Sequence, residues 1–172
     1  KPRFQALLRP AVGRLSGAGV TANQVTLAAC AVSLALGLGL YATGAPRAAL
    51  ALVPAWMALR MAFNAVDGML AREFGQQSAL GAYLNELADV LADAALFAPF
   101  ALQPALGWPA VCTVIVLSGV SEMAGALGPM VGAPRQYDGP LGKSDRALLF
   151  GTLGLWLGLA GSLPAAAFWL MP

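Results

Sequence analysis

Long apolar runs alternate with short polar breaks along this chain, and the pattern predicts a bundle of membrane-spanning helices. Crossing a hydrocarbon core about 30 Å thick takes about 20 helical residues. The runs that meet this requirement lie at about 24–41, 48–72, 79–102, 110–130 and 147–160. Residues 163–172 are too few to cross, so a sixth span is either truncated there or only dips into the membrane. We expect one all-α integral membrane domain over residues 1–172, with five to six transmembrane helices.

The first twenty residues follow a different pattern, in which basic and apolar side chains alternate at roughly helical spacing. The basic residues are Lys1, Arg3, Arg9 and Arg14, and Phe4, Leu7, Leu8, Val12 and Leu15 lie between them. Such spacing is typical of an amphipathic helix that lies on a membrane surface. A solvated tail is the alternative interpretation.

Composition supports a membrane protein and excludes several kinds of chemistry. Hydrophobic residues make up 59% of the chain and charged residues 10%, against about 25% charge in soluble domains. The mean hydropathy is +0.71. No histidine is present, which excludes histidine-based catalysis and histidine-ligated zinc. Cys30 and Cys112 lie within apolar runs and are expected to be small buried hydrophobes. With a net charge of only +2, no nucleic-acid partner is expected.

The placement of Lys and Arg predicts the orientation in the membrane. Basic residues gather before the first span, at the end of the second, and between the fourth and fifth. These places share one side of the membrane, and only Arg47 falls on the other side. Since cytoplasmic loops carry the excess of Lys and Arg, we place the N-terminus in the cytoplasm.

Acids and amides interrupt the apolar pattern in the second and third spans. Half of the 8 acidic residues lie within these two spans: Asp67, Glu86, Asp89 and Asp93. A charged group at membrane depth indicates a functional site, because lipid does not solvate it. Helical spacing places Arg60, Asn64 and Asp67 on one face, and Gly81, Asn85, Asp89 and Asp93 on another. The short turn between these spans predicts antiparallel packing, with the two polar faces meeting below the cytoplasmic surface.

These side chains suit a hard cation. Carboxylate and amide oxygens, without His or Cys, favour Mg²⁺, Mn²⁺ or Ca²⁺, and Mg²⁺ often joins protein carboxylates to substrate phosphates. A further carboxylate can take a proton from an attacking hydroxyl. We therefore expect transfer of a phosphate-linked group at the membrane surface. The alternative is a purely structural set of interhelical hydrogen bonds and ion pairs, for example Arg60 with Glu122.

In this stretch the sequence resembles the CDP-alcohol phosphatidyltransferase (CDP-alcohol phosphotransferase) family. That family's signature is D-x₂-D-G-x₂-A-R-x₈-G-x₃-D-x₃-D. Its spacing is met throughout, although asparagine replaces the first and third aspartates; the matching positions are Asn64, Asp67, Gly68, Ala71, Arg72, Gly81, Asn85 and Asp89. Thr21-Ala22-Asn23-Gln24-Val25-Thr26 resembles the family's Pro-Asn-x-x-Thr segment, and Gly142-Lys143 resembles its later Gly-Lys pair. The resemblance covers about residues 21–146.

The resemblance implies a site for one or two Mg²⁺ or Mn²⁺ ions, with Asp89 also acting as general base. The implied metal ligands are Asn64, Asp67, Asn85 and Asp89. We hypothesise that Glu86 and Asp93, outside the signature, restore the acidity lost at the two asparagines. The implied nucleotide contacts are Asn23, Thr26, Gly68, Ala71, Arg72 and Gly81. Arg135, Lys143 and Arg146 are candidates for binding an anionic acceptor, or they serve only the positive-inside topology.

The implied activity moves a phosphatidyl group from a CDP-alcohol, most often CDP-diacylglycerol, to an alcohol acceptor. CMP is released, and the reaction belongs to phospholipid biosynthesis. The resemblance also implies a homodimer in the bacterial inner membrane, with its active site facing the cytoplasm. Two alternatives stay open. The asparagines favour a non-catalytic relative that binds a nucleotide-lipid or a partner protein. A small transporter would instead use Arg60, Glu86, Asp93 and Glu122 as an intramembrane relay.

Overall fold

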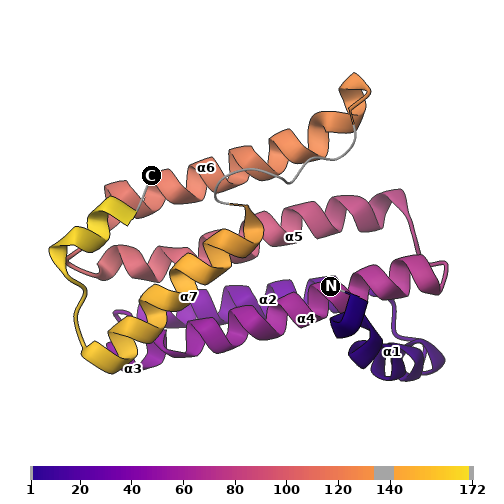
Figure 1. Cartoon of the computed structure of the whole chain (residues 1–172), viewed down its shortest axis with the longest axis horizontal. Coiled ribbons are helices and arrows are strands. Elements are labelled where there is room, and N and C mark those ends of the chain that lie inside the picture. Colours follow the sequence, from indigo (N-terminus) through magenta and orange to yellow (C-terminus); the bar gives the residue numbers. More distant parts are fainter. Residues whose placement is uncertain (1, 134–141, 171–172) are drawn as a thin grey trace.

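The structure, a computed structural model, describes residues 2–133 and 142–170, and the regular elements of this part are helices only. Figure 1 shows α2, α4, α5 and α6 running along the long axis, with α7 crossing obliquely and α1 at one end. The all-α prediction is confirmed for these residues. The elements are α1 (Pro2–Gly17), α2 (Ala22–Ala42), α3 (Arg47–Leu50), α4 (Leu52–Glu73), α5 (Ala79–Phe97), η1 (Ala98–Leu102), α6 (Gly107–Leu127), η2 (Gly128–Val131), α7 (Lys143–Ala160) and η3 (Ala165–Leu170).

Three stretches of the described chain are long and apolar enough to cross a membrane: Ala22–Ala42, Arg47–Glu73 and Gly107–Val131. The third predicted span corresponds to α5, which contains Glu86, Asp89 and Asp93. The fifth corresponds to α7, whose first turn contains charged residues, among them Asp145. These charges lower the hydropathy of both helices, so composition supports fewer spans than the five to six expected.

Side-chain caps begin α2 and α5 at the positions where the sequence leaves its polar turns. The Thr21 hydroxyl accepts a hydrogen bond from the Gln24 amide at 3.2 Å. The Gln24 side chain in turn accepts one from the Thr21 amide at 2.9 Å. This reciprocal pair is a capping box. Ser78 likewise accepts from the Gly81 amide at 2.9 Å. The two caps fix the first turns of α2 and α5 at the same end of the bundle.

The second predicted span is not one continuous helix. α3 ends at Leu50, Ala51 forms a turn, and α4 begins at Leu52, so Pro54 lies in the first turn of α4. A proline is tolerated in a first turn, where its missing N–H would have no helical acceptor. Glycines of α7 pack closely on this break: a Cβ on Gly154 would lie 2.7 Å from the Leu50 carbonyl oxygen. The glycine face of α7, formed by Gly151, Gly154 and Gly158, therefore packs within the chain.

The closest helix packing in the bundle joins α2 to α5. At Gly37 of α2 an added Cβ would lie only 2.1 Å from the Ala95 carbonyl oxygen of α5. α2 also packs along α4, whereas α4 and α5 have few direct backbone contacts with each other. α2 therefore supports both helices and leaves a gap between them, which polar side chains span.

Two apolar clusters hold the bundle together. In the larger cluster, Phe150 of α7 stacks on Phe97 with 3.8 Å between ring centroids and meets Phe100 edge-on at 5.1 Å. The smaller cluster joins α1, α2 and α4, and within it Val12 is fully buried against residues such as Val66 and Leu70. The smaller cluster attaches α1 to the end of α4.

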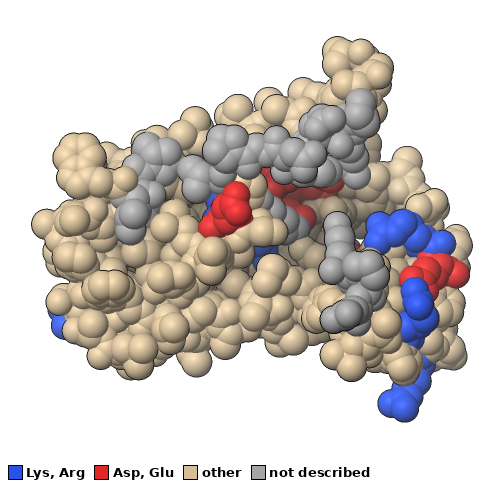
Figure 2. All heavy atoms as spheres, viewed as in Figure 1, with Lys and Arg blue, Asp and Glu red and all other residues tan. Residues whose placement is uncertain are grey.

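An ion pair reinforces the attachment of α1. Nε and Nη2 of Arg9 each donate to one carboxylate oxygen of Glu73 at 3.0 Å. Hydrogen bonding to this carboxylate, and then its charge, raise the pKa of Arg9 above its usual value. In Figure 2 Lys and Arg gather at the end of the molecule where α1 lies, and most of the remaining face is uncharged. The charged end of the bundle is thus also the end where α2 and α5 begin.

The Gly37 contact predicts a stability difference between two glycines of the same helix. Gly37→Ala should lower the free energy of unfolding by about 1–3 kcal/mol, because the methyl group must push α2 away from α5. Gly39→Ala is the matched control, since a Cβ there meets nothing within 4 Å. Thermal unfolding in detergent measures both, and equal midpoints would contradict the close α2–α5 packing.

Candidate active site

A pocket of about 330 Å³ opens between the first turns of α2 and α5 and the last turns of α4. It contains all of the predicted nucleotide contacts and three of the predicted metal ligands. Its lining residues are Ala22, Asn23, Thr26, Asn64, Asp67, Gly68, Ala71, Arg72, Gln76, Gln77, Ser78, Gly81, Ala82 and Asn85. The signature residues of α4 and α5 thus meet Asn23 and Thr26 of α2 in one pocket.

Asp67 is held from the α2 side of the pocket. Its carboxylate Oδ2 accepts a hydrogen bond of 2.7 Å from the Thr26 hydroxyl, and both residues are buried. Burying a carboxylate is costly unless donors replace water. Thr26 supplies such a donor and fixes the orientation of the Asp67 carboxylate.

Two glycines make room for polar side chains in the pocket wall. A Cβ on Gly68 would lie 2.8 Å from Nη2 of Arg72, so the guanidinium folds back over Gly68. A Cβ on Gly81 would lie 2.8 Å from Oδ1 of Asn23. The exposed Arg72 is suited to a phosphate, because a guanidinium binds phosphate oxygens in pairs.

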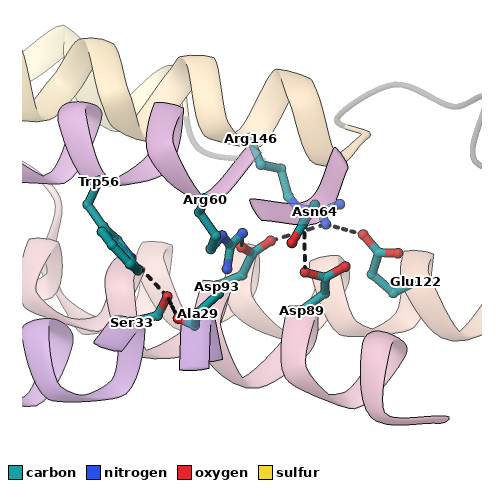
Figure 3. A network of polar contacts seen from close by, with 9 residues as sticks. All are labelled: Ala29, Ser33, Trp56, Arg60, Asn64, Asp89, Asp93, Glu122 and Arg146. Carbon is teal, nitrogen blue, oxygen red and sulfur yellow. Dashed lines mark hydrogen bonds and ion pairs between the residues drawn. The ribbon is translucent and has the colours of Figure 1, made fainter. Parts of the chain in front are cut away.

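Asp89 adjoins the pocket through Asn64. The Asn64 amide donates to Oδ1 of Asp89 at 3.3 Å, across the gap between α4 and α5 (Figure 3). Asp89 is 8% exposed and does not itself line the pocket. It lies one helical turn below Asn85, which does. The arrangement gives two carboxylates, Asp67 and Asp89, on facing helices.

Asp93 belongs to a buried charge network, defined here as Arg60, Asp93, Glu122 and Arg146. Arg60 is ion-paired with Oδ1 of Asp93. Nη2 of Arg146 lies 3.3 Å from Oδ2 of Asp93 and 2.5 Å from Oε1 of Glu122. All four are at most 7% exposed, and Figure 3 shows Arg146 reaching between the two acids. Structural ion pairs are therefore present, although Arg60 pairs with Asp93 rather than with Glu122.

The remaining predicted residues lie elsewhere. Glu86 lines a separate, mostly apolar groove of about 680 Å³ between α5 and α6, which diverge toward the α1 end (Figure 1). The hypothesis that Glu86 and Asp93 replace missing metal ligands stays a prediction, and neither residue lines the pocket with Asp67. Arg146 is 1% exposed and held by acids. Arg135 lies outside the described residues, as does the side chain of Lys143, the first residue of α7.

Sequence reasoning missed Gln76. Its side-chain oxygen accepts a hydrogen bond of 2.7 Å from the Ala22 amide, and its nitrogen donates to the Val20 carbonyl at 3.4 Å. These bonds attach the α4–α5 turn to the start of α2 and complete one wall of the pocket. The only signal in the sequence was the polarity of residues 73–78, which is also typical of an ordinary turn.

The oxygen ligands at this site suit a hard divalent cation only if a substrate supplies further ligands. Within the described part of the chain, no three His, Cys, Asp or Glu residues gather into a group able to hold a metal. The site offers the carboxylates of Asp67 and Asp89 and the amide oxygens of Asn64 and Asn85. Mg²⁺ is commonly bound by one or two carboxylates plus substrate phosphates. The residues present fit a cation of that kind.

Fold and site together define a helical membrane protein with a pocket of acids, amides and arginine at the charged end of its bundle. The family model of the CDP-alcohol phosphatidyltransferases matches residues 19–171, and the chain belongs to this family.

Relatives agree with this assignment. The chain is 48% identical over 155 residues to the inner membrane protein YnbA of Escherichia coli, covering 90% of this chain and 77% of that protein. It is 31% identical over 152 residues to the phosphatidylinositol phosphate synthase of Streptomyces avermitilis, covering 85% of this chain and 61% of the relative.

Solved structures share the fold. The crystal structure of Mycobacterium tuberculosis phosphatidylinositol phosphate synthase (PgsA1) with CDP-DAG bound superposes with a TM-score of 0.74 at 24% identity. The match covers 94% of this chain and 84% of that one. The apo form of the same synthase gives a TM-score of 0.65 at 23% identity.

The Thr26–Asp67 hydrogen bond predicts a stability effect. Thr26→Val keeps the shape of the side chain but removes the donor to a buried carboxylate, which should cost about 1.5–3 kcal/mol. Thr113→Val is the control, because its exposed hydroxyl bonds only the Pro109 carbonyl. Thermal unfolding in detergent should show a larger loss for Thr26→Val. Equal losses would mean that Asp67 does not depend on Thr26.

Proposed function

We propose that this protein transfers a phosphatidyl group from a CDP-alcohol, CDP-diacylglycerol, to an alcohol acceptor and releases CMP. The observation that carries the proposal is one pocket in which signature residues of α4 and α5, among them Asp67 and Arg72, meet Asn23 and Thr26 of α2, with Asp89 adjoining through Asn64. The bound CDP-DAG in the Mycobacterium tuberculosis relative supports the choice of donor.

The nucleotide is assigned to the described pocket. Asn23 and Thr26 present polar groups from the first turn of α2, and Arg72 presents its guanidinium to the diphosphate. Gly68, Ala71 and Gly81 leave space for the substrate, because larger side chains at these positions would fill the pocket.

Asp89 is assigned the role of general base. It takes the proton of the acceptor hydroxyl, whose oxygen then attacks the phosphorus that bears the lipid, and the bond to CMP breaks. The Asn64 amide holds one carboxylate oxygen of Asp89 and so orients the base. Catalysis of this kind depends mostly on positioning and on stabilising charge.

A single Mg²⁺ or Mn²⁺ ion is assigned to Asp67 and Asp89, with Asn64 and Asn85 contributing amide oxygens. When bound, such an ion neutralises charge on the diphosphate and on the departing CMP. Two carboxylates supply too little negative charge for two ions, which is why we propose one.

Placement in the membrane is part of the proposal. We assign the protein to the bacterial inner membrane, as the name of the Escherichia coli relative indicates for that protein. The basic residues at the pocket end support a cytoplasmic side for the pocket and the N-terminus, because cytoplasmic segments carry the excess of Lys and Arg. α1 then lies at the interface, and α5 and α7 cross the bilayer with Asp93 and Arg146 paired inside the bundle. The homodimer implied by the resemblance uses a face other than the α7 glycines.

A non-catalytic relative that binds a nucleotide-lipid is the second candidate. The observation in its favour is that no three acids of the described residues gather at the pocket. This candidate predicts binding of CDP-diacylglycerol without release of CMP.

Release of CMP by the purified protein tests the main proposal. The protein in detergent receives CDP-diacylglycerol, Mg²⁺ or Mn²⁺, and a mixed panel of alcohols. Wild type should release CMP only with metal, and Asp89→Asn should lower the rate by about 10²-fold or more. Glu73→Gln is the control, because this exposed acid pairs with Arg9 and should keep the wild-type rate. Binding of CDP-diacylglycerol without any release would favour the non-catalytic candidate.

The metal assignment makes a separate prediction. Asn85→Asp adds a carboxylate beside the pair of acids and should tighten Mn²⁺ binding by about tenfold, since ligand charge governs the affinity of hard cations. Glu86→Gln, at the neighbouring position on the groove side of α5, should leave that affinity unchanged. Titration calorimetry with Mn²⁺ and CDP-diacylglycerol measures both. Weaker Mn²⁺ binding in Glu86→Gln would mean that Glu86 is a metal ligand after all.

A further inference from the structure

We infer that Arg60 and Arg146 are positioning residues, which hold Asp89 in place through the buried charge network. The inference rests on the proposed function, because it concerns the base of that reaction. Neither arginine belongs to the family signature, and neither lines the nucleotide pocket.

The argument begins with the register of α4 and α5. Arg60 and Asn64 are four residues apart on α4, and Asp93 and Asp89 are four residues apart on α5. Arg60 contacts Asp93 and Asn64 contacts Asp89, so the two antiparallel helices are joined by two contacts one turn apart. The backbones of α4 and α5 have few direct contacts, and these side chains span the gap that α2 leaves between the two helices.

The two contacts differ in strength. The Asn64–Asp89 hydrogen bond is 3.3 Å long and only part-buried, so it cannot by itself keep two helices in register. Arg60 and Asp93 form an ion pair with both side chains 5% exposed. A shift of Asp93 against Arg60 also shifts Asp89, one turn away on α5, against Asn64. The Arg60–Asp93 ion pair therefore sets the geometry of the Asn64–Asp89 hydrogen bond.

Arg146 extends this constraint to the other helices of the bundle. Through Asp93 and Glu122 it joins the first turn of α7 to α5 and α6. The network holds two positive and two negative charges. Each charge meets an opposite charge only when all four helices are in their native positions. A slip of one helix would bury a charge without its partner, which costs far more than a slip between apolar surfaces.

An apolar cluster at this position would hold the helices together equally well. Replacing a buried ion pair by packed apolar residues is often neutral or stabilising. One turn deeper, two of these helices, α5 and α7, are already joined by the stacked rings of Phe97 and Phe150. The charged residues add a fixed register between the helices, one turn away from Asp89.

The test compares a balanced double variant with a balanced control. Arg60→Gln with Asp93→Asn removes one positive and one negative charge and leaves the Arg146–Glu122 pair. We expect a thermal midpoint and a KM for CDP-diacylglycerol close to wild type, but a kcat lower by about tenfold to a hundredfold, as for a small misplacement of a catalytic group. Arg9→Gln with Glu73→Gln removes a balanced surface pair and should leave all three unchanged.

Arg60→Lys keeps the charge but loses the planar guanidinium, and it should lower kcat by a smaller factor. If the double variant does not fold, the kcat, KM and thermal midpoint of Arg60→Lys test the inference in its place. A wild-type kcat in either folded variant would overturn the inference. So would a loss of kcat that only follows a loss of the thermal midpoint. Absence of CMP release from the wild-type protein would instead refute the proposed function.

Discussion

Every buried carboxylate at this site needs a donor from the protein, because burial removes most of the water that would otherwise solvate it. Asp67 receives the Thr26 hydroxyl, Asp89 the Asn64 amide, and Asp93 the guanidinium of Arg60. Each partner comes from a different helix than its acid. These contacts are possible only because α2 packs tightly on α5 at Gly37 and keeps α4 at side-chain distance. The apolar packing of α2 thus decides where the polar site can exist.

The two asparagines change the chemistry of the pocket in a definite direction. An aspartate at position 64 would repel Asp89, and both acids would need a cation between them. Asn64 instead donates a hydrogen bond to Asp89, so the facing side chains attract each other directly. The site therefore has a closed arrangement of its own that does not depend on a bound metal. In the proposed function this arrangement lowers the affinity for a cation, and the diphosphate takes a larger share in binding it.

The sequence was sufficient for the helices and for the pocket, since both follow from local pattern. Apolar runs predicted the helical stretches, and the fixed spacing of the signature placed Asn64, Asp67, Gly68 and Gly81 on facing helices. The sequence predicted contacts poorly where the two contacting residues lie far apart along the chain. Arg146 meets Asp93 across 53 residues, and nothing in either segment indicates that contact.

Two further features could not be predicted from the sequence. The break at Ala51 depends on how α7 glycines pack against α3, which periodicity does not contain. The side chain of Gln76 became part of a pocket wall by bonding the start of α2, and a polar turn residue carries no sign of such a role. In both cases the deciding contact joins elements that the chain sequence keeps apart.

The caps on α2 and α5 have an electrostatic consequence for the pocket. Both helices begin at its wall, where Asn23 and Thr26 of α2 meet Ser78 and Gly81 at the start of α5. Aligned peptide dipoles give each helix N-terminus roughly half a positive elementary charge. Two such ends converge on a pocket that also holds the Asp67 carboxylate. In the proposed function, the direction of these two helices therefore helps the pocket to hold the diphosphate of the nucleotide.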